Sequence, residues 1–134
     1  MPVEISSAAV DQIIAAAARA MPREACGLLL GDRKRISTCS EAANVAANPY
    51  RHFEIEPEAL FAALHAERAG GDKLLGYWHS HPYGDPSPSE TDLAMAPRDG
   101  RLWLIVAGER VRLWRAPGNG WRAGGFEAVE FRIF

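Results

Sequence analysis

The sequence predicts an α/β domain in which a β-sheet is flanked by helices. Two segments repeat apolar residues at helical spacing, and several short segments are either continuously apolar or alternate with a period of two. Turn residues separate these segments, as expected for alternating strands and helices. The chain has 134 residues, 48% of them hydrophobic, so one domain over residues 1–134 can bury a sizeable core.

The N-terminal half combines short strands with two amphipathic helices. The first helix starts near Ser6 or Ser7, places apolar residues on one face, and closes at Pro22. The second begins at Pro57 and stops at Gly70-Gly71. Four strands are expected in this half, at residues Val3–Ile5, Ala25–Leu30, Arg35–Cys39 and His52–Ile55.

The segment from Leu74 to His79 is apolar and rich in aromatic residues, which indicates a largely buried strand. A short helix follows, with Ser87 as the predicted N-cap, Pro88 in the first helical position and Glu90 completing a capping box. In this register Ser89 does no capping and is free to point elsewhere.

Three further strands are expected after that helix. The residue pair Gly108-Glu109 predicts a tight hairpin between the first two of them. The strands are Leu102–Ala107, Arg110–Arg115 and a final one over Val129–Ile133.

The run HSHPYGDPSPSETD, residues 79–92, predicts a metal site. His79 and His81 are two apart on a strand, so their side chains share a face, with Cα atoms roughly 6.5 Å apart. Two imidazoles at that separation can bind one zinc ion. Ser89 and Asp92 share a helical face, and Asp92 can supply a third ligand. Three protein ligands leave a fourth position for water, which is typical of catalytic zinc and indicates a metallohydrolase.

Each part of this pattern also has a simpler interpretation. Strand histidines two apart are more often surface or core residues than ligands, and Ser89-x-x-Asp92 alone fits a capping box. Glu24, taken by itself, is a solvated charge just after a helix-ending proline. The histidines and the Ser–Asp pair become informative together, because the turn between them folds the helix back beside the strand.

The pattern His-Ser-His, seven residues, Ser, two residues, Asp resembles the signature of the JAMM (MPN-plus) zinc metalloproteases. The segment Pro22–Gly31 is similar to the element that carries that family's catalytic glutamate, and Glu24 takes the glutamate's place. The resemblance implies a mixed sheet of the MPN type with cytidine-deaminase-like architecture. It also implies one zinc ion per chain, with His79, His81 and Asp92 as ligands.

The resemblance further implies that Glu24 is the general base and that Ser89 donates a hydrogen bond to the developing oxyanion. Enzymes of this family cut the amide bond that follows the tail of ubiquitin-like proteins. This compact chain looks like the small bacterial members, which are associated with sulfur-carrier proteins ending in Gly-Gly. We therefore expect an isopeptidase or peptidase with such a carrier as substrate.

The composition excludes several other functions. The net charge is −2, so no overall field favours nucleic acid or membrane. There is no membrane-spanning run, and the first residues lack a signal-peptide pattern. Two cysteines do not make a disulfide scaffold, and a reducing cytoplasm is the expected location.

Three alternative functions remain open. A non-catalytic MPN scaffold would act by binding proteins, although such relatives usually lack ligands or the glutamate. The loop HPYGDPSPS suggests a RadC-like, DNA-repair-associated protein, but no basic patch or added helical region accompanies it. A zinc nucleoside deaminase shares the implied architecture, but its His-x-Glu and Pro-Cys-x-x-Cys ligands are absent.

Several other residues have plausible but simpler roles. Cys26 shares a predicted face with Glu24 and lines the site, where a buried thiol is favoured over a nucleophile. Asp85 is assigned to turn chemistry. The remaining histidines and tryptophans are expected to be structural, namely His52, His65, Trp103, Trp114 and Trp121.

Overall fold

A single mixed β-sheet organises the computed structural model, which describes residues 2–118 and 125–134. The sheet has eight strands in the order β7-β6-β5-β4-β2-β3-β1-β8. The strands are β1 (Val3–Ile5), β2 (Cys26–Asp32), β3 (Arg35–Ala42), β4 (Lys73–Ser80), β5 (Leu102–Ala107), β6 (Arg110–Arg115), β7 (Glu127–Val129) and β8 (Phe131–Ile133). The helices are α1 (Ser7–Ala20), α2 (Pro57–Arg68) and α3 (Glu90–Met95).

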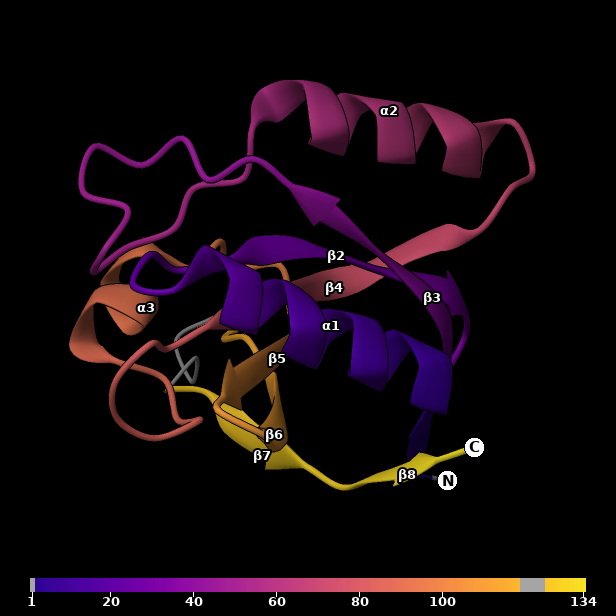
Figure 1. Cartoon of the computed structure of the whole chain (residues 1–134). Helices are drawn as coiled ribbons and strands as arrows, with labels where there is room; N and C mark the ends of the chain where they lie inside the picture. The colour runs from indigo at the N-terminus through magenta and orange to yellow at the C-terminus, as the bar shows by residue number, and fades with distance from the viewer. Residues whose placement is uncertain (1, 119–124) are drawn as a thin grey trace.

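The sheet contains both parallel and antiparallel pairs of strands. β1 is parallel to both β3 and β8, and β4 is parallel to β5, while the remaining neighbours are antiparallel. Helix α1 crosses one face, α2 lies over the other, and α3 sits at the end of β4 (Figure 1). The prediction of a mixed sheet flanked by helices is confirmed. None of the helices in the described parts of the chain has the length and apolarity needed to cross a bilayer.

The first helix follows directly from its sequence. Ser6 is the N-cap, and its hydroxyl accepts the Ala9 N–H at 3.1 Å. Proline cannot continue a helix, and α1 ends at Ala20, two residues before Pro22. The buried side of α1 consists of small and branched apolar residues, namely Ala9, Val10, Ile13, Ala16 and Ala17.

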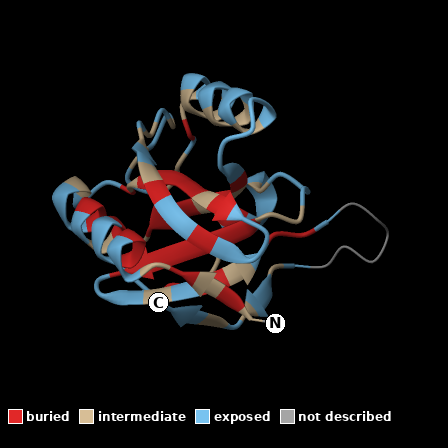
Figure 2. Cartoon of the chain, turned by 90° about the vertical axis from the view of Figure 1, so that its right-hand side faces the viewer, coloured by how far each residue is buried: buried red, intermediate tan, exposed pale blue. Residues whose placement is uncertain are grey.

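Two apolar clusters occupy the two faces of the sheet. The larger lies under α1 and includes Leu29, Trp78 and Leu104, all fully buried (Figure 2). The smaller lies under α2 and includes Cys26 and Leu28. Helix α2 contributes only half-buried side chains to it, so this second face is thinly covered. Trp78 of β4 points into the larger cluster. Because neighbouring residues along a strand point to opposite sides, His79 points to the thinly covered face, and the candidate site lies there.

The predicted strand over His52–Ile55 is wrong. Only Ile55 pairs, in an isolated bridge with Asn44. The Asn44 side chain takes the place of a partner strand, since its Nδ2 donates to the His52 carbonyl at 3.0 Å and its Oδ1 accepts the Glu54 N–H at 3.1 Å. Side-chain amides compete with backbone ladders in this way.

The predicted final strand over Val129–Ile133 is also wrong in extent, because the segment forms two strands. Val129 pairs with Leu113 of β6, whereas Phe131 pairs with Val3 of β1. Only Glu130 lies between β7 and β8, so the two ends of the eight-stranded order are joined by one residue. The sheet therefore curls round until its edges approach one another. Trp121, expected to be structural, lies outside the described residues.

Candidate active site

Strand β4 carries the first histidine of the site. His79 is fully buried and lies between Cys26 of β2 and Ile105 of β5 in the ladder. Its ring stacks on Phe53, with centroids 4.2 Å apart and an interplanar angle of 18°, and meets the edge of Trp103 at 5.4 Å. The burial and stacking together fix the orientation of this imidazole.

His81 follows the end of β4 and is held by hydrogen bonds. Its backbone N–H donates to the Val106 carbonyl at 2.8 Å, and its Nδ1 lies 2.8 Å from the Asp85 carbonyl. A carbonyl only accepts, so neutral His81 carries its proton on Nδ1 and keeps a lone pair on Nε2. Asp85 was predicted only as a turn residue, and the contact of its backbone carbonyl with His81 was not foreseen.

Asp92, in helix α3, completes the cluster. Its Oδ2 lies 3.1 Å from the Nε2 atoms of both His79 and His81, and those two nitrogens are 3.1 Å apart. Asp92 is only 5% exposed. The structure thus brings together all three predicted ligands, 13 residues apart in sequence at most.

The cap of α3 differs from the prediction. Ser89, not Ser87, is the N-cap, and α3 begins at Glu90. Ser89 Oγ accepts the Asp92 N–H, and the Ser89 N–H donates to Asp92 Oδ2, both at 3.0 Å. The chain contains two overlapping Ser-x-x-acid patterns, and only the second brings its acid to His79 and His81. The expectation that Ser89 is free of capping is therefore wrong.

The capping geometry is nevertheless compatible with the predicted chemistry of Ser89. Its hydroxyl oxygen accepts a backbone N–H, which leaves the hydroxyl proton able to donate. Ser89 is exposed and lines a hollow together with Glu24 and His81. It can therefore reach a molecule bound in that hollow.

The ionisation of the cluster follows from its contacts. Burial raises the pKa of Asp92, but hydrogen bonds from His79, His81 and the Ser89 backbone outweigh it, so the pKa lies well below its usual range. Burial dominates at His79 and lowers its pKa. Burial also acts to lower the pKa of His81, but hydrogen bonds to Asp92 and Asp85 raise it overall. The cluster therefore holds an ionised carboxylate at neutral pH.

The three ligand atoms fit a small divalent cation. Four-coordinate zinc with bonds of about 2.0–2.1 Å separates its ligand atoms by roughly 3.3–3.4 Å, and the three separations here are each 3.1 Å. Two imidazole nitrogens and one carboxylate oxygen form a donor set that suits zinc. Within the described residues these are the only His, Cys, Asp or Glu side chains grouped closely enough to bind a metal.

Glu24 lies just before β2 and is 6% exposed. Its backbone is fixed on both sides, since its N–H donates to the Pro49 carbonyl at 2.8 Å and its carbonyl accepts from Asn44 Nδ2 at 2.9 Å. Its Oε1 is buried without a hydrogen-bond partner among the described residues. Burial raises the Glu24 pKa to about 7, His81 acts to lower it, and Asp92 acts to raise it. A carboxyl with such a pKa can both take and release a proton near neutral pH.

Ser80 lies between the two histidines and binds the backbone of Ala25, the residue after Glu24. Its Oγ accepts the Ala25 N–H at 2.8 Å, and its own N–H donates to the Ala25 carbonyl at 3.0 Å. These bonds hold the residue after Glu24 against the end of β4. Ser80 had no predicted role, although its place in the middle of His-Ser-His was a signal.

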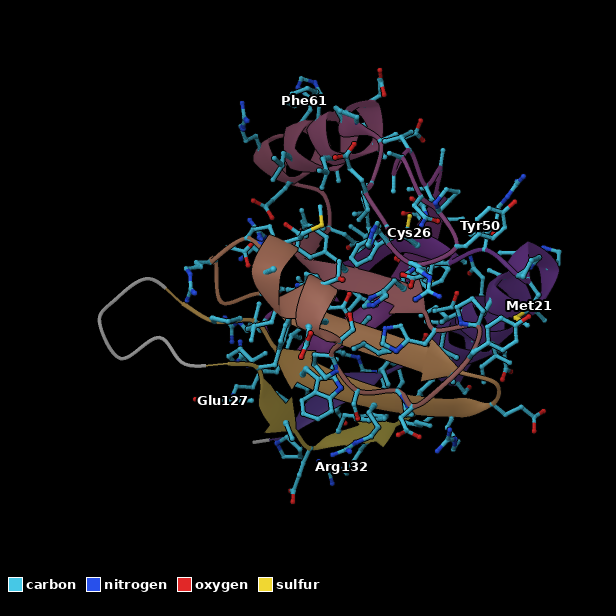
Figure 3. All side chains as sticks on the ribbon, turned by 90° about the vertical axis from the view of Figure 1, so that its left-hand side faces the viewer. Met21, Cys26, Tyr50, Phe61, Glu127 and Arg132 are labelled. Carbon is cyan, nitrogen blue, oxygen red and sulfur yellow. The ribbon has the colours of Figure 1, made fainter. Side chains whose placement is uncertain are left out.

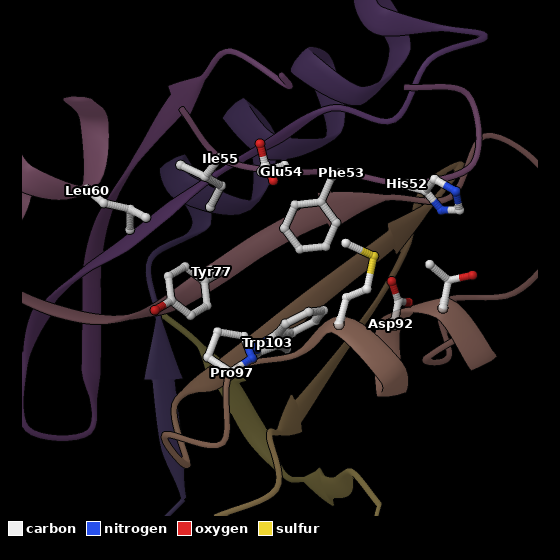
Figure 4. Close-up of a pocket in the computed structure, with 11 residues that line it drawn as sticks. His52, Phe53, Glu54, Ile55, Leu60, Tyr77, Asp92, Pro97 and Trp103 are labelled. Atoms are coloured by element: carbon white, nitrogen blue, oxygen red, sulfur yellow. The ribbon is translucent and has the colours of Figure 1, made fainter. Parts of the chain in front are cut away.

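Two hollows flank the cluster. An apolar pocket beside Asp92 is lined by Phe53, Tyr77 and Trp103, among others (Figure 4). A second, more polar hollow includes Glu24 and Ser89. His52 lines both hollows, so it belongs to the surroundings of the site and not only to the structural background. Trp103 is buried as predicted, but sequence reasoning missed its contact with the His79 ring.

Cys26 is a buried, protonated thiol. It is 1% exposed, and its Sγ lies 3.6 Å from the Ala42 carbonyl. Burial, followed by the charges of Glu24 and Glu56, raises its pKa to about 12, which disfavours a nucleophilic thiolate. Figure 3 shows Cys26 near the centre of this side of the molecule, whereas Tyr50 and Met21 lie at its exposed edge. The expectation of a small buried thiol is confirmed.

Comparisons with known proteins agree with this geometry. A desampylase of Haloferax volcanii is 39% identical over 88 residues, which cover 64% of this chain and 63% of that protein. A probable TtuB-protein conjugate cleaving protease of Thermus thermophilus is 33% identical over 105 residues, covering 71% and 70% of the two chains. The chain thus spans slightly less than two thirds of the length of the Haloferax relative.

A protein of Desulfitobacterium hafniense, known from a solution structure, superposes with a TM-score of 0.82 at 24% identity. The superposition covers 98% of this chain and 92% of that one, and shows a shared fold. Residues 6–117 match the family described as prokaryotic homologues of the JAB domain. The resemblance to JAMM proteins is confirmed, and the chain belongs to this prokaryotic JAB-domain family.

Proposed function

We propose that this protein is a zinc-dependent isopeptidase that hydrolyses the amide bond after the Gly-Gly tail of a ubiquitin-like or sulfur-carrier protein. The observation that carries the proposal is the cluster of His79 Nε2, His81 Nε2 and Asp92 Oδ2, at mutual distances of 3.1 Å, with Glu24 and Ser89 lining a hollow beside it. A metal centre, a buried acid and an exposed hydroxyl on one hollow are the parts that amide hydrolysis needs.

In this proposal His79, His81 and Asp92 would hold one zinc ion beside the polar hollow. When bound, zinc lowers the pKa of a water molecule to about 7 and polarises the substrate carbonyl. Asp92 is kept ionised by its contacts, which suits a metal ligand. His81 is kept in the tautomer that offers Nε2, because its Nδ1 lies against the Asp85 carbonyl.

Glu24 acts as the general base. It removes a proton from the attacking water and delivers that proton to the departing amine, so its pKa has to lie near the working pH. Burial supplies this by raising the pKa to about 7. Hydrogen bonds on its backbone N–H and carbonyl, to Pro49 and Asn44, keep the carboxyl facing the hollow.

Ser89 stabilises the negative charge that develops on the carbonyl oxygen. Its Oγ accepts the Asp92 N–H, a bond that does not use the hydroxyl proton, so this proton can be donated to that oxygen. The same residue holds Asp92 Oδ2 through its backbone N–H, so Ser89 links the ligand to the site of charge development.

The substrate class is supported by the relatives and by the shape of the site. One relative is named a desampylase and another a probable TtuB-protein conjugate cleaving protease, and the second name describes cleavage of a protein conjugate. The apolar pocket beside Asp92 offers a position for an apolar side chain of the modifier's tail. The polar hollow around Glu24 then receives the amine.

Conjugate cleavage tests this proposal. Zinc-loaded protein should release a Gly-Gly-terminated carrier from an adduct with an amino acid or a lysine side chain, and Glu24→Gln should not. A matched adduct whose last glycine is replaced by valine serves as the substrate control. Robust cleavage of unrelated peptides together with an intact Gly-Gly adduct would overturn the substrate class. Full biological activity of Glu24→Gln would instead favour a non-catalytic scaffold.

A further inference from the structure

Strand β6 holds the loop that follows His81 at two points. The Trp114 indole N–H donates to the Pro86 carbonyl at 3.0 Å, and Arg110 Nη2 donates to the Gly84 carbonyl at 3.3 Å. Arg110 Nη2 also lies 3.5 Å from Asp85 Oδ1. Arg110 and Trp114, four residues apart on the same face of β6, thus hold the carbonyls of Gly84 and Pro86, which lie on either side of Asp85 in the chain.

The Asp85 carbonyl is the atom that His81 Nδ1 contacts, at 2.8 Å. The two histidines differ in how they are fixed. His79 is enclosed between Phe53 and Trp103, and its Nδ1 has no hydrogen-bond partner among the described residues. His81 is partly exposed and lies on a loop, so the hydrogen bond to Asp85 has to do what packing does for His79.

We propose that Trp114 and Arg110 are positioning residues for the metal centre: they hold Gly84 and Pro86 so that the Asp85 carbonyl fixes His81 with Nε2 toward Asp92. The inference rests on the metal site of the proposed function, but not on its substrate. Neither residue touches the ligand atoms, and both act through the backbone of the loop.

The sheet makes β6 a suitable anchor for this loop. β6 pairs with β5 along its whole length, and β5 is buried throughout and pairs with β4, the strand of His79. The loop after His81 is thus anchored to the same sheet that carries His79. The Trp114 ring is also supported from its own strand, because the Arg112 guanidinium lies over it at 4.6 Å. The separation of the two Nε2 atoms is therefore set by the sheet and not by the loop alone.

Two variants remove the contacts separately. Trp114→Phe keeps an aromatic ring and deletes the N–H, and Arg110→Gln shortens an exposed side chain. Each should weaken zinc binding about tenfold, and the double variant more, as is typical when the partner of a metal-binding histidine is lost. Zinc affinity is measured in the full chain by competition with a chromogenic chelator.

Arg115→Gln is the matched control. Arg115 also donates to a glycine carbonyl, that of Gly100 at 3.1 Å, but this carbonyl is not in the loop after His81. Its zinc affinity should stay within twofold of wild type. Arg110→Lys, which keeps a cationic donor, should recover most of the loss seen in Arg110→Gln.

Two spectroscopic readouts separate positioning from general destabilisation. The visible absorption bands of cobalt-substituted protein should shift in Trp114→Phe and Arg110→Gln but not in Arg115→Gln. The His81 Nδ1–H resonance of the zinc-loaded protein should exchange faster with solvent in the same two variants. If Trp114→Phe does not fold, the exposed Arg110 series decides the matter.

Unchanged zinc affinity and cobalt spectra in Arg110→Gln would overturn the inference, and so would an equal loss in Arg115→Gln. The substrate can be wrong without affecting this result. A protein that binds zinc with the expected variant pattern, yet cleaves no Gly-Gly adduct, would refute the proposed function and leave the positioning role intact.

Discussion

Glu24 is the residue on which turnover depends most in the proposed reaction. It binds no metal in that scheme, and its Oε1 is buried without a partner among the described residues. Glu24→Gln preserves the shape of the side chain and removes its ability to accept a proton. We expect unchanged zinc content and a rate lower by about 10²–10⁴. Metal analysis and single-turnover cleavage measure the two quantities, and a loss of zinc equal to that of His79→Ala would contradict the assigned role.

The same carboxyl makes the stability of the zinc-free protein depend on pH. Burial raises the pKa of Glu24 from 4.5 in the unfolded chain to about 7 in the folded one. The folded state therefore holds the Glu24 proton more tightly than the unfolded chain does. The contribution of Glu24 to stability is complete below pH 4.5 and is lost as the pH rises through 7. Relative to Glu24→Gln, wild type should lose about 3 kcal/mol in unfolding free energy across that range.

Urea unfolding of both proteins in chelator, at pH 5 and pH 8, measures the difference. All other titrating groups are shared, so subtracting one protein from the other isolates Glu24. A constant difference between the two proteins at both pH values would show that the carboxyl is solvated in solution.

Ser89 has two separable roles, as helix cap and as hydrogen-bond donor. Ser89→Ala removes both, and should cost about 1 kcal/mol of stability and roughly 10²–10³ in rate. Ser89→Gly also removes the hydroxyl, but the weaker helix cap lowers the stability by only about 0.3 kcal/mol. Both variants should therefore be equally slow while differing in thermal stability. A Gly variant with wild-type turnover would show that Ser89 only caps the helix.

Sequence spacing predicted that His79, His81 and Asp92 lie together, whereas Glu24 and the role of Ser89 were inferred only from the family resemblance. It could not decide which serine caps α3. Ser87-x-x-Glu90 and Ser89-x-x-Asp92 have equal local merit. The choice depends on Asp92 reaching His79 and His81, which are contacts between elements.

At the level of secondary structure, the spacing of β4 and β5 depends on a residue without a side chain. A Cβ at Gly76 would lie 1.9 Å from the Leu102 carbonyl oxygen, a backbone atom that cannot move away cheaply. Gly76→Ala should therefore separate the strands and cost about 3 kcal/mol or more. It should also weaken zinc binding, because His79 lies three residues further along β4.

Gly118→Ala is the control for this prediction. Nothing lies within 4 Å of a Cβ at Gly118, so its effect on the unfolding free energy should stay within about 0.5 kcal/mol. Chemical denaturation of both variants measures the contrast. Similar stability of the two alanine variants would mean that β4 and β5 adjust without strain.

The periodicity of apolar residues was sufficient to predict α1, α2 and the hairpin of β5 and β6. It failed where pairing is decided by partners distant in sequence. Residues 52–55 have strand-like composition, yet Asn44 takes their backbone hydrogen bonds. The alternation of Val129, Phe131 and Ile133 is real, but it cannot reveal that Val129 pairs with β6 and Phe131 with β1.

For the molecule as a whole, the sheet order explains how the site forms. β2 and β4 are antiparallel neighbours, so the start of β2 lies beside the end of β4, with Cys26 opposite His79. Glu24 precedes β2 and His81 follows β4, which brings residues 57 positions apart to one edge of the sheet. No local pattern encodes this proximity. The thin cover of α2 over the same face leaves the hollows open.

Metal binding should stabilise the whole fold, because the ligands come from β4, the loop after it and α3. A ligand that binds only the folded state adds about 2.7 kcal/mol at one hundred times its dissociation constant. For a chain of this size that corresponds to a rise in melting temperature of about 10 °C. Thermal unfolding with zinc and with chelator measures this rise, which we expect in wild type and in Glu24→Gln.

Asp92→Ala tests whether the cluster is the source of that stabilisation. It removes the carboxylate that both Nε2 atoms face at 3.1 Å, and with it the negative charge that offsets the cation. Its melting temperature should be the same with zinc and with chelator. A full rise of about 10 °C in this variant would place the ion elsewhere. A rise in wild type that is absent from Glu24→Gln would make Glu24 a ligand and remove it from the role of base.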